Sequence, residues 1–172
     1  GPAVSGHTGR LLVATPLIGD PHFERTVVLL LAHSLAGAYG VVLNRPTDVP
    51  VAEVAPAWST LVSAPGVVFV GGPVDPAATI GLALAGDRSA VDPFEVVVGP
   101  AAMIDLQQPP ELHDGSVEGL RVFAGSAGWA PGQLEDELAD GAWWAVDAEP
   151  GDLVVEEPQR LWARVLRRQP GE

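Results

Sequence analysis

The chain of 172 residues contains no cysteine and no lysine. Without cysteine it cannot form disulfides, thiolate zinc sites, iron–sulfur clusters or a thiol nucleophile. Without lysine it lacks the phosphate-binding side chain of a P-loop. No run approaches the roughly 18 apolar residues that a membrane-spanning helix needs. These absences exclude thiol redox chemistry and the P-loop nucleotide-binding proteins.

Positive charge is scarce as well. Nine basic residues, all arginine, stand against 22 acidic residues, which gives a formal net charge of −13. A chain this acidic is repelled by the nucleic-acid backbone, so we do not expect direct nucleic-acid binding. Four arginines gather within residues 160–168, beside an apolar stripe. We interpret them as the solvated face of a terminal helix, paired locally with Glu156 and Glu157.

The start of the chain does not have the pattern of a signal peptide, so we expect a cytoplasmic location. Gly1-Pro2 is typical of the scar that a protease leaves when a tag is removed. We therefore expect residues 1–8 to be a tag remnant or disordered. A chain of this length buries roughly 70% of its extended-chain surface, which is enough for a core without disulfides. The prediction is one domain spanning residues 1–172.

Apolar runs broken by glycine and proline predict mostly short strands. Residues 26–32 (TVVLLLA) do not alternate, which favours a strand covered on both faces, although periodicity leaves a buried helix open. Gly37 and Gly40 bracket a turn, and its loop of about five residues favours a hairpin with a bulge or a longer loop. Pro46 ends the second strand of this hairpin. Predicted strands lie near 10–15, 25–33, 40–44, 67–71, 79–85, 94–99, 120–124 and 142–147, predicted helices near 51–62, 131–140 and 158–168, and loops at 86–93 and 105–118.

Five motifs follow one another in a fixed order. They are G-x-L-L-x-A-x-P at Gly9–Pro16, D-P-x-F-x-R-x-V at Asp20–Val27, H-x-x-x-G-A-x-G-x-V-L-N-R-P at His33–Pro46, G-G-P-V at Gly71–Val74 and G-W-x-x-G-Q-L-E-x-E at Gly128–Glu137. By these motifs the chain resembles the AlgH/YqgE family of bacterial proteins, also called DUF179 or UPF0301, over about residues 9–168. The sequence W-x-x-V-L-R-R-Q at 162–169 is similar to that of actinobacterial members.

The resemblance implies an α+β fold with a curved, barrel-like mixed β-sheet and helices packed around it. Some members carry the label of transcriptional regulator, which the acidic composition does not support as direct DNA binding. Two positions depart from relatives. Ser126 replaces an aromatic residue that many of them have, and Leu31 replaces a cysteine that some have.

We expect the motif residues to gather into a surface that binds a protein partner or a small ligand without breaking bonds. This hypothesis assigns no catalytic residue, no metal and no cofactor. The candidate binding residues are Asp20, Phe23, Arg25, His33, Asn44, Arg45, Gly71, Gly72, Pro73, Trp129, Gln133 and Glu135.

Several of these positions allow a second interpretation. Asp20, His22 and Glu24 have the spacing of metal ligands on an extended strand. The structural alternative is that Asp20 caps a helical turn and Phe23 anchors that turn in the core. Gly71 and Gly72 follow a strand and are better explained by a tight turn or a close backbone approach than by phosphate binding.

Two interpretations are also open for the helix that follows Trp129 and for the histidine that ends the predicted strand at 25–33. Glu135 near the helix N-terminus is stabilised by the helix dipole, while Trp129 and Gln133 could line a groove. His33 could act as a general base, or it could be a structural histidine satisfied by the backbone and by neighbouring carboxylates.

Two function hypotheses therefore stand side by side. The first is the non-catalytic regulatory or adaptor protein. The second is a hydrolase or lyase that uses His33, Asp20 and Arg25, which requires these three side chains to meet in one water-accessible cleft. A third alternative, which comes from the family resemblance alone, is a structural partner of the pre-ribosomal-RNA nuclease often encoded beside this family.

Overall fold

A computed structural model describes residues 6–85, 96–98, 101–113 and 117–168. The predicted loop at 86–93 lies outside these residues, as do residues 1–5 of the segment expected to be a tag remnant or disordered. Residues 6–8, in contrast, contact the body of the protein, because the backbone N–H of His7 donates to His33 Nδ1 at 3.2 Å.

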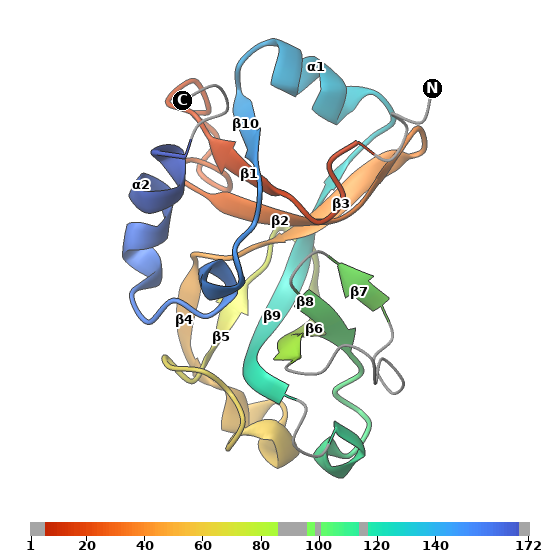
Figure 1. Cartoon of the computed structure of the whole chain (residues 1–172), viewed down its shortest axis with the longest axis vertical. Helices are drawn as coiled ribbons and strands as arrows, with labels where there is room; N and C mark the ends of the chain where they lie inside the picture. Colours follow the sequence, from red (N-terminus) through yellow and green to blue (C-terminus); the bar gives the residue numbers. More distant parts are fainter. Residues whose placement is uncertain (1–5, 86–95, 99–100, 114–116, 169–172) are drawn as a thin grey trace.

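The fold is α+β, with one 10-stranded mixed sheet and few helices (Figure 1). The strand order is β10-β1-β2-β3-β9-β6-β8-β7, and β5 pairs with both β4 and β9. The sheet is not closed, so the expected barrel-like form is only a loose description. The strands are β1 (Leu11–Ala14), β2 (Val27–Ser34), β3 (Gly37–Val42), β4 (Pro46–Pro50), β5 (Val67–Val70), β6 (Val74–Ala85), β7 (Val96–Val98), β8 (Ala101–Ile104), β9 (Val117–Trp129) and β10 (Trp143–Val146).

The long strand β9 joins two halves of the molecule. Its last residues pair with β3 in the half that contains β1, β2 and β10 (Figure 1). Its earlier residues pair antiparallel with β6 and parallel with β5 in the half that contains β4 and β8. The predicted strand at 120–124 is therefore much longer than expected, and β4 and β8 were not predicted.

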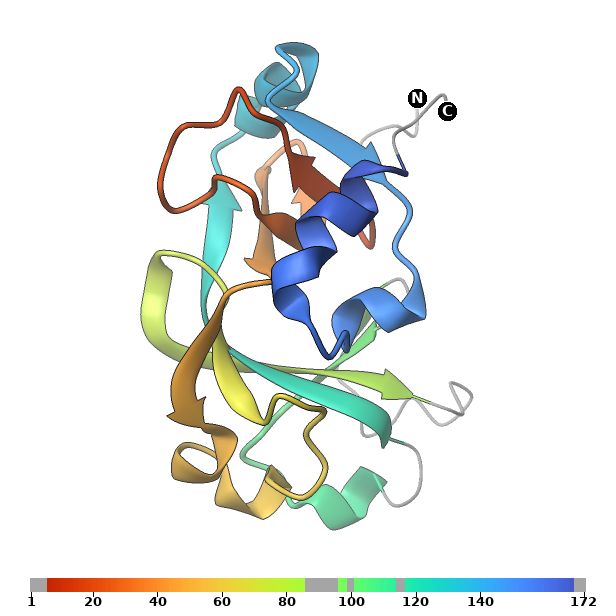
Figure 2. The ribbon, with the colours of Figure 1, turned by 90° about the vertical axis from the view of Figure 1, so that its left-hand side faces the viewer.

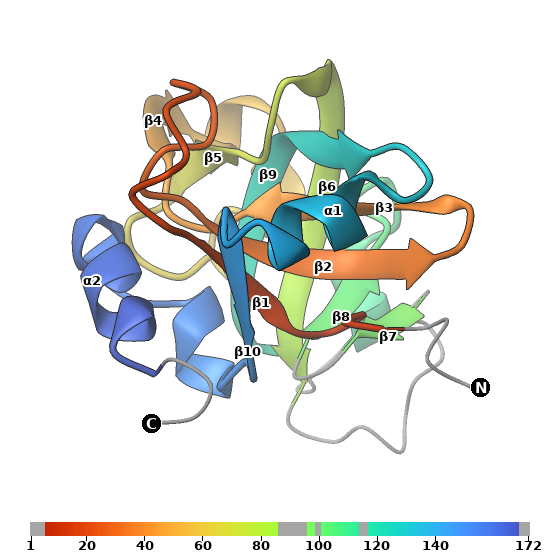
Figure 3. The same ribbon diagram turned by 90° about the horizontal axis from the view of Figure 1, so that it is seen from above.

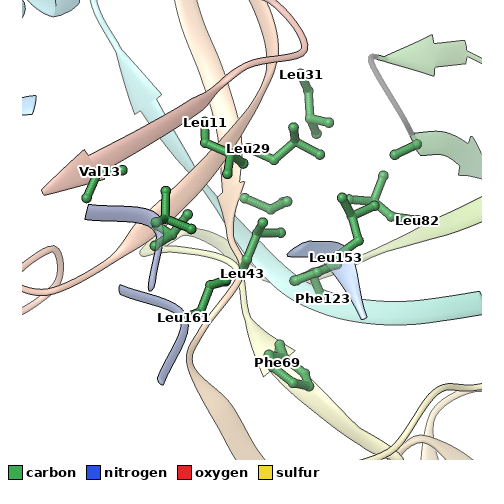
Figure 4. Packing of buried hydrophobic residues seen from close by; sticks show 14 of the residues in the cluster. Leu11, Val13, Leu29, Leu31, Leu43, Phe69, Leu82, Phe123, Leu153 and Leu161 are labelled. Carbon is green, nitrogen blue, oxygen red and sulfur yellow. The ribbon is translucent and has the colours of Figure 1, made fainter. Parts of the chain in front are cut away.

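The strand β2 is covered on both faces, as the absence of alternation predicted. Val27, Leu29 and Leu31 belong to one buried cluster, and Val28 and Leu30 belong to another. Figure 4 shows the first cluster, in which Leu29 lies beside Leu11 of β1, while Leu153 and Leu161 belong to the C-terminal part of the chain. The connection is a hairpin with a bulge, seen as a register shift between Leu30 and Ala32 on β2. The predicted turn between Gly37 and Gly40 is wrong, because both glycines lie within β3 and pair with β2.

Two short α-helices cover opposite faces of this half. Helix α1 (Gln133–Ala139) buries Leu134 in the second cluster, and helix α2 (Leu161–Leu166) buries Leu161 and Val165 in the first. Figure 2 shows α2 against one side of the sheet, and the view in Figure 3 places α1 across β2 and β3. Both helices are shorter than predicted.

The predicted helix at 51–62 is wrong. Two 3₁₀ helices, η2 (Val51–Glu53) and η3 (Pro56–Trp58), occupy the segment instead. Pro56 stands inside the predicted helix, where it removes a backbone donor and disfavours helical backbone at the residue before it. Trp58 is buried there in a third cluster. The remaining 3₁₀ helices are η4 (Pro110–His113), η5 (Pro150–Leu153) and η6 (Pro158–Arg160).

Arg121 on β9 is a buried cation, with 2% of its surface exposed. Its guanidinium donates to the carbonyls of Leu153 (3.1 Å), Ala64 (2.6 Å) and Val155 (2.6 Å). It also lies 4.5 Å from the ring centroid of Phe69. Burial lowers the pKa of Arg121 to about 10, so the group stays charged at neutral pH. Arg121 thereby fastens the C-terminal segment to the sheet.

The arginines of the terminal helix are paired with carboxylates, but only in part with those predicted. Arg160 contacts Glu157 at 3.1 Å. Arg168 contacts Glu149 at 2.9 Å and the fully buried Asp152 at 2.7 Å. The charge of Asp152 is therefore compensated inside the fold, and these arginines hold α2 to the preceding loop.

A candidate ligand pocket of aromatic rings and carboxylates

The loop between β1 and β2 is folded back by its own hydrogen bonds. The backbone N–H groups of Phe23 and Glu24 donate to the carbonyl of Asp20 at 2.9 and 2.8 Å, which makes one helical turn. Asp20 Oδ1 accepts from the backbone N–H of His22 at 2.9 Å. The predicted capping role of Asp20 is confirmed, and the turn carries Phe23 toward the sheet.

Phe23 packs against two tryptophans that come from β9 and β10. Its ring centroid lies 6.3 Å from that of Trp129 and 6.0 Å from that of Trp143. The two indoles are 5.8 Å apart with an edge-to-face geometry, at an angle of 76°. Such pairs are favoured by the quadrupoles of the rings. The aromatic triad, by which we mean these three residues, is a rigid wall built from segments distant in sequence.

A carboxylate on α1 orients this wall. Glu137 Oε1 accepts the indole N–H of Trp129 at 3.0 Å and that of Trp143 at 2.9 Å. Glu137 Oε2 accepts from Gln133 Nε2 at 3.0 Å, and Gln133 Oε1 accepts from the backbone N–H of Ala130. Glu137 was not among the predicted site residues. Two signals in the sequence could have found it, since Glu137 closes the fifth motif and stands at i, i+4 from Gln133.

A cavity of about 290 Å³ opens beside the aromatic triad. Four predicted residues line it together, namely Asp20, Phe23, Trp129 and Gln133. A volume of this order is at the lower end for small-ligand sites. The complete lining is Ile18, Gly19, Asp20, Phe23, Gly128, Trp129, Gln133, Glu137, Ala142 and Trp143.

A second group of predicted residues supports the loop from its other side. Arg45 donates to the carbonyls of Pro21 (3.0 Å) and Glu24 (2.7 Å). With Gly72 and Pro73, Arg45 lines a small hollow of about 70 Å³. Arg45 therefore acts on the candidate pocket through the loop backbone.

The two glycines after β5 confirm the prediction of a close backbone approach. A Cβ at Gly71 would lie 2.3 Å from the carbonyl oxygen of Gly125, and one at Gly72 would lie 2.3 Å from the backbone of Ser126. Gly72 also has φ +151°. Side chains at these positions would push the segment away from β9.

Arg25 and Asn44 fix the point where the loop enters β2. Asn44 Nδ2 donates to the carbonyl of Arg25 at 2.9 Å, and Asn44 Oδ1 accepts from the backbone N–H of Val27 at 3.1 Å. Arg25 itself has the left-handed φ of +57°, and its guanidinium carbon lies 5.6 Å from the ring centroid of Trp162 on α2. Neither residue lines the cavity.

His33 and Glu135 form a separate pair at the far end of β2. His33 Nε2 lies 3.3 Å from Glu135 Oε2, and the rings of His7 and His33 stack 5.7 Å apart. A hydrogen bond to its own backbone, followed by His33, lowers the pKa of Glu135. Burial, followed by the neighbouring charge of Arg10, lowers the pKa of His7.

This arrangement contradicts the geometry that the hydrolase or lyase hypothesis requires. Arg25 precedes β2 and His33 lies near its end, so roughly 25 Å of strand separates them. Glu135 also lies about 200° around α1 from Gln133. The motif residues therefore do not share one surface. The cavity and the His33–Glu135 pair lie at two separate sites, since neither His33 nor Glu135 lines the cavity.

The spacing of Asp20, His22 and Glu24 does not produce a metal site in the described part of the chain, where no group of three potential ligands has suitable geometry. Only His22 Nδ1 and Asp20 Oδ1 are in contact, at 3.2 Å. In the same residues, no helix combines the length and the apolar character needed to cross a membrane.

The fold and the cavity together define an α+β protein with an open mixed sheet and a pocket lined partly by aromatic rings, which lies beside β9. The chain belongs to the AlgH-like family, DUF179, which matches residues 11–172. It is 52% identical to a UPF0301 protein of Streptomyces coelicolor over 98% of this chain and 90% of that protein. A UPF0301 protein of Streptomyces avermitilis is 51% identical with the same coverage.

Solved structures agree with the fold. A crystal structure of a Corynebacterium diphtheriae protein is similar with a TM-score of 0.89 and 34% identity, covering 96% of this chain and 88% of that one. The solution structure of the AlgH protein from Pseudomonas aeruginosa is similar with a TM-score of 0.71 and 30% identity, covering 98% and 90%. The family resemblance seen in the sequence is therefore confirmed.

Proposed function

We propose that this protein is a non-catalytic binding protein, with a regulatory or adaptor role in the cytoplasm, and that its recognition site is the aromatic cavity. The observation that carries the proposal is the Glu137 carboxylate. It accepts both indole N–H groups of the wall and thereby holds the cavity in one shape before any ligand arrives. Preorganisation of this kind reduces the entropy lost on binding.

The chemistry of the lining supports binding over catalysis. The lining residues include no serine, threonine, histidine or lysine. The side chains that could transfer protons, Asp20 and Glu137, already accept hydrogen bonds from their own surroundings. A hydrolase or lyase built on His33, Asp20 and Arg25 is not favoured, because these residues lie at separate places.

Fragment binding observed by NMR tests this proposal. The indole N–H signals of Trp129 and Trp143 report directly on the wall, and a mixed set of acidic, neutral and basic fragments would be titrated against them. We expect some fragments to shift both signals saturably. If no fragment shifts either signal at millimolar concentration, the cavity is not a binding site and the proposal fails.

A blocked variant and a matched control make the test specific. Gly19 lines the cavity, and a Cβ added there would meet no atom within 4 Å, so Gly19→Leu should fold and obstruct the cavity. Ala52→Leu adds the same apolar bulk at an exposed position of η2. We expect fragment binding, and the capture of partners from bacterial cytosol, to be lost in Gly19→Leu and retained in Ala52→Leu. Equal binding by both variants would place the site elsewhere.

A further inference from the structure

The charge of the cavity is of one sign. Asp20 and Glu137 contribute two carboxylates, and none of the ten described residues that line the cavity is an arginine, lysine or histidine. The whole chain adds a formal charge of −13. Such a field raises the local concentration of cations and repels anions. A ligand with a positive group is therefore favoured over phosphates, carboxylates and nucleotides.

The aromatic wall strengthens the same preference. Cations are attracted to the faces of indole and phenyl rings. Both indole N–H groups donate to the negatively charged Glu137, which polarises the rings toward greater electron density. The centroids of the triad lie 5.8–6.3 Å apart, so the rings touch one another and leave no room for a cation between them. Trp129 and Trp143 are only 7% and 2% exposed, so the half-buried ring of Phe23 is the part of the wall that a cation could contact.

One carboxylate oxygen remains available to a ligand. Asp20 Oδ1 is used by His22, whereas Oδ2 accepts no hydrogen bond within the described part of the chain. A planar guanidinium can stack on an aromatic face while its N–H groups donate to a carboxylate, and it is less strongly hydrated than an ammonium. The geometry of wall and carboxylate therefore fits an arginine side chain better than a lysine side chain.

Two exposed apolar side chains form part of the rim of the cavity, beside the exposed polar lining residues Asp20 and Gln133. Leu17 precedes the lining residue Ile18 and is 73% exposed, and Val74, which is 45% exposed, lies 3.9 Å from the Cβ position of the lining residue Gly128. Exposed apolar side chains around a charged pocket are typical of protein interfaces, in which an arginine anchor is surrounded by contacts that exclude water. A free small cation would leave this rim uncovered.

From these four observations we infer that the cavity receives an arginine side chain presented by a partner protein. The inference rests on the proposed function and adds the chemical class of the group that is recognised. The cavity is large enough for one extended side chain and too small for a nucleotide-sized cofactor. The guanidinium would lie against Phe23, the half-buried member of the aromatic triad, with its N–H groups directed to Asp20.

Peptide titrations test the chemical class. The probes are a blocked Gly-Arg-Gly peptide, its citrulline analogue, its lysine analogue and arginine amide, each followed by the indole N–H signals of Trp129 and Trp143. Citrulline keeps the shape of arginine without its charge. We expect the arginine peptide to bind about tenfold more tightly than the citrulline peptide, and its affinity to fall as salt is added. Equal affinities for arginine and citrulline would overturn the inference.

Two charge-neutral variants locate the contact. Asp20→Asn preserves the shape of the cavity and removes one charge, whereas Asp136→Asn removes a charge from an exposed position of α1 outside the lining. We expect arginine affinity to fall several-fold in Asp20→Asn and to stay unchanged in Asp136→Asn. The same loss in both variants would reduce the effect to general electrostatics and overturn the assignment to Asp20.

The remaining outcomes separate this inference from the proposed function. Fragments that bind while no arginine peptide does would leave the binding function standing and refute the arginine class. If arginine amide binds as tightly as the peptide, the pocket takes a free cation and the partner protein is refuted. Indole shifts that appear on raising the protein concentration alone would assign the pocket to a second copy of this chain, which also refutes a separate partner.

Discussion

Arg121 and Glu137 are each a charge held by several neutral dipoles, and they differ in what surrounds them. Three backbone carbonyls surround Arg121, which has almost no exposed surface. Three side-chain N–H groups surround Glu137, which lines an open cavity. The buried charge of Arg121 therefore joins segments of the fold in one half of the molecule, whereas the charge of Glu137 orients the wall of a cavity in the other. If the cavity binds a ligand as we propose, accessibility rather than charge separates the two roles.

The largest effect is expected from Arg121→Met. The substitution keeps apolar volume and leaves three carbonyls, among them those of Leu153 and Val155, without their donor. We expect a loss of about 3 kcal/mol in the free energy of unfolding. Urea denaturation measures this loss, with Arg167→Met at an exposed position of the terminal segment as the control. A variant Arg121→Met as stable as the control would refute the structural role of Arg121. A change in arginine-peptide affinity as large as that of Asp20→Asn would refute the separation of its role from that of the cavity.

A smaller loss of stability and a larger loss of binding are expected from Glu137→Ala. The indole N–H groups of Trp129 and Trp143 would lose their shared acceptor, which we expect to destabilise the protein by about 2 kcal/mol. The wall would also lose its fixed orientation, so ligand affinity should fall even where the protein remains folded. Urea denaturation and the indole titration measure the two effects separately. Affinity equal to that of the unmodified protein in a folded Glu137→Ala variant would show that the carboxylate does not organise the pocket.

The sequence predicted parts of this contrast and missed others for identifiable reasons. The β2 run was predicted correctly because burial on both faces leaves a local signature of uninterrupted apolar residues. The helix predicted at 51–62 is wrong because Pro56 interrupts the segment, which forms two 3₁₀ helices instead. Strand β4 was missed because it begins and ends with proline, which a strand tolerates at an edge.

The candidate site was predicted in pieces. Phe23, Trp129 and Gln133 were named from their motifs, and the structure brings them to one cavity with Asp20. Glu137 was missed because its role depends on Trp143, which the pairing of β10 with β1 places beside Trp129. A contact of this kind depends on strands that are distant in sequence, so local patterns do not contain it. The expectation that His33 and Arg25 converge was wrong for a local reason, because Arg25 precedes β2 and His33 lies near its other end.

The variant Trp143→Phe removes one of the three N–H donors to Glu137 and keeps an aromatic ring at this position. Glu137 would retain the indole of Trp129 and the amide of Gln133, so we expect a loss of only about 1 kcal/mol. The indole signal of Trp129 should move, because it would share Oε1 with no other donor. Trp144→Phe, on the opposite face of β10, is the matched control in urea denaturation and NMR. Identical spectra for the Trp129 indole in both variants would argue against a shared acceptor.

The smallest effect concerns the His33–Glu135 pair and the pH. The pKa of Glu135 is lowered in the folded protein, so the unfolded chain binds more protons as the medium is acidified. The stability that Glu135 contributes is therefore complete above the unfolded glutamate pKa and is lost as the pH falls through the lower folded pKa. His7 acts in the same direction at higher pH, because its lowered pKa means that protonation near and below its ordinary value of 6.5 favours the unfolded state. In Glu135→Gln the acid-dependent part of the unfolding free energy should shrink, while indole signals of the cavity stay in place, since Glu135 faces away from Gln133 and Glu137. Movement of the Trp129 and Trp143 indole signals in Glu135→Gln would instead join the two places into one site and remove the distinction between them.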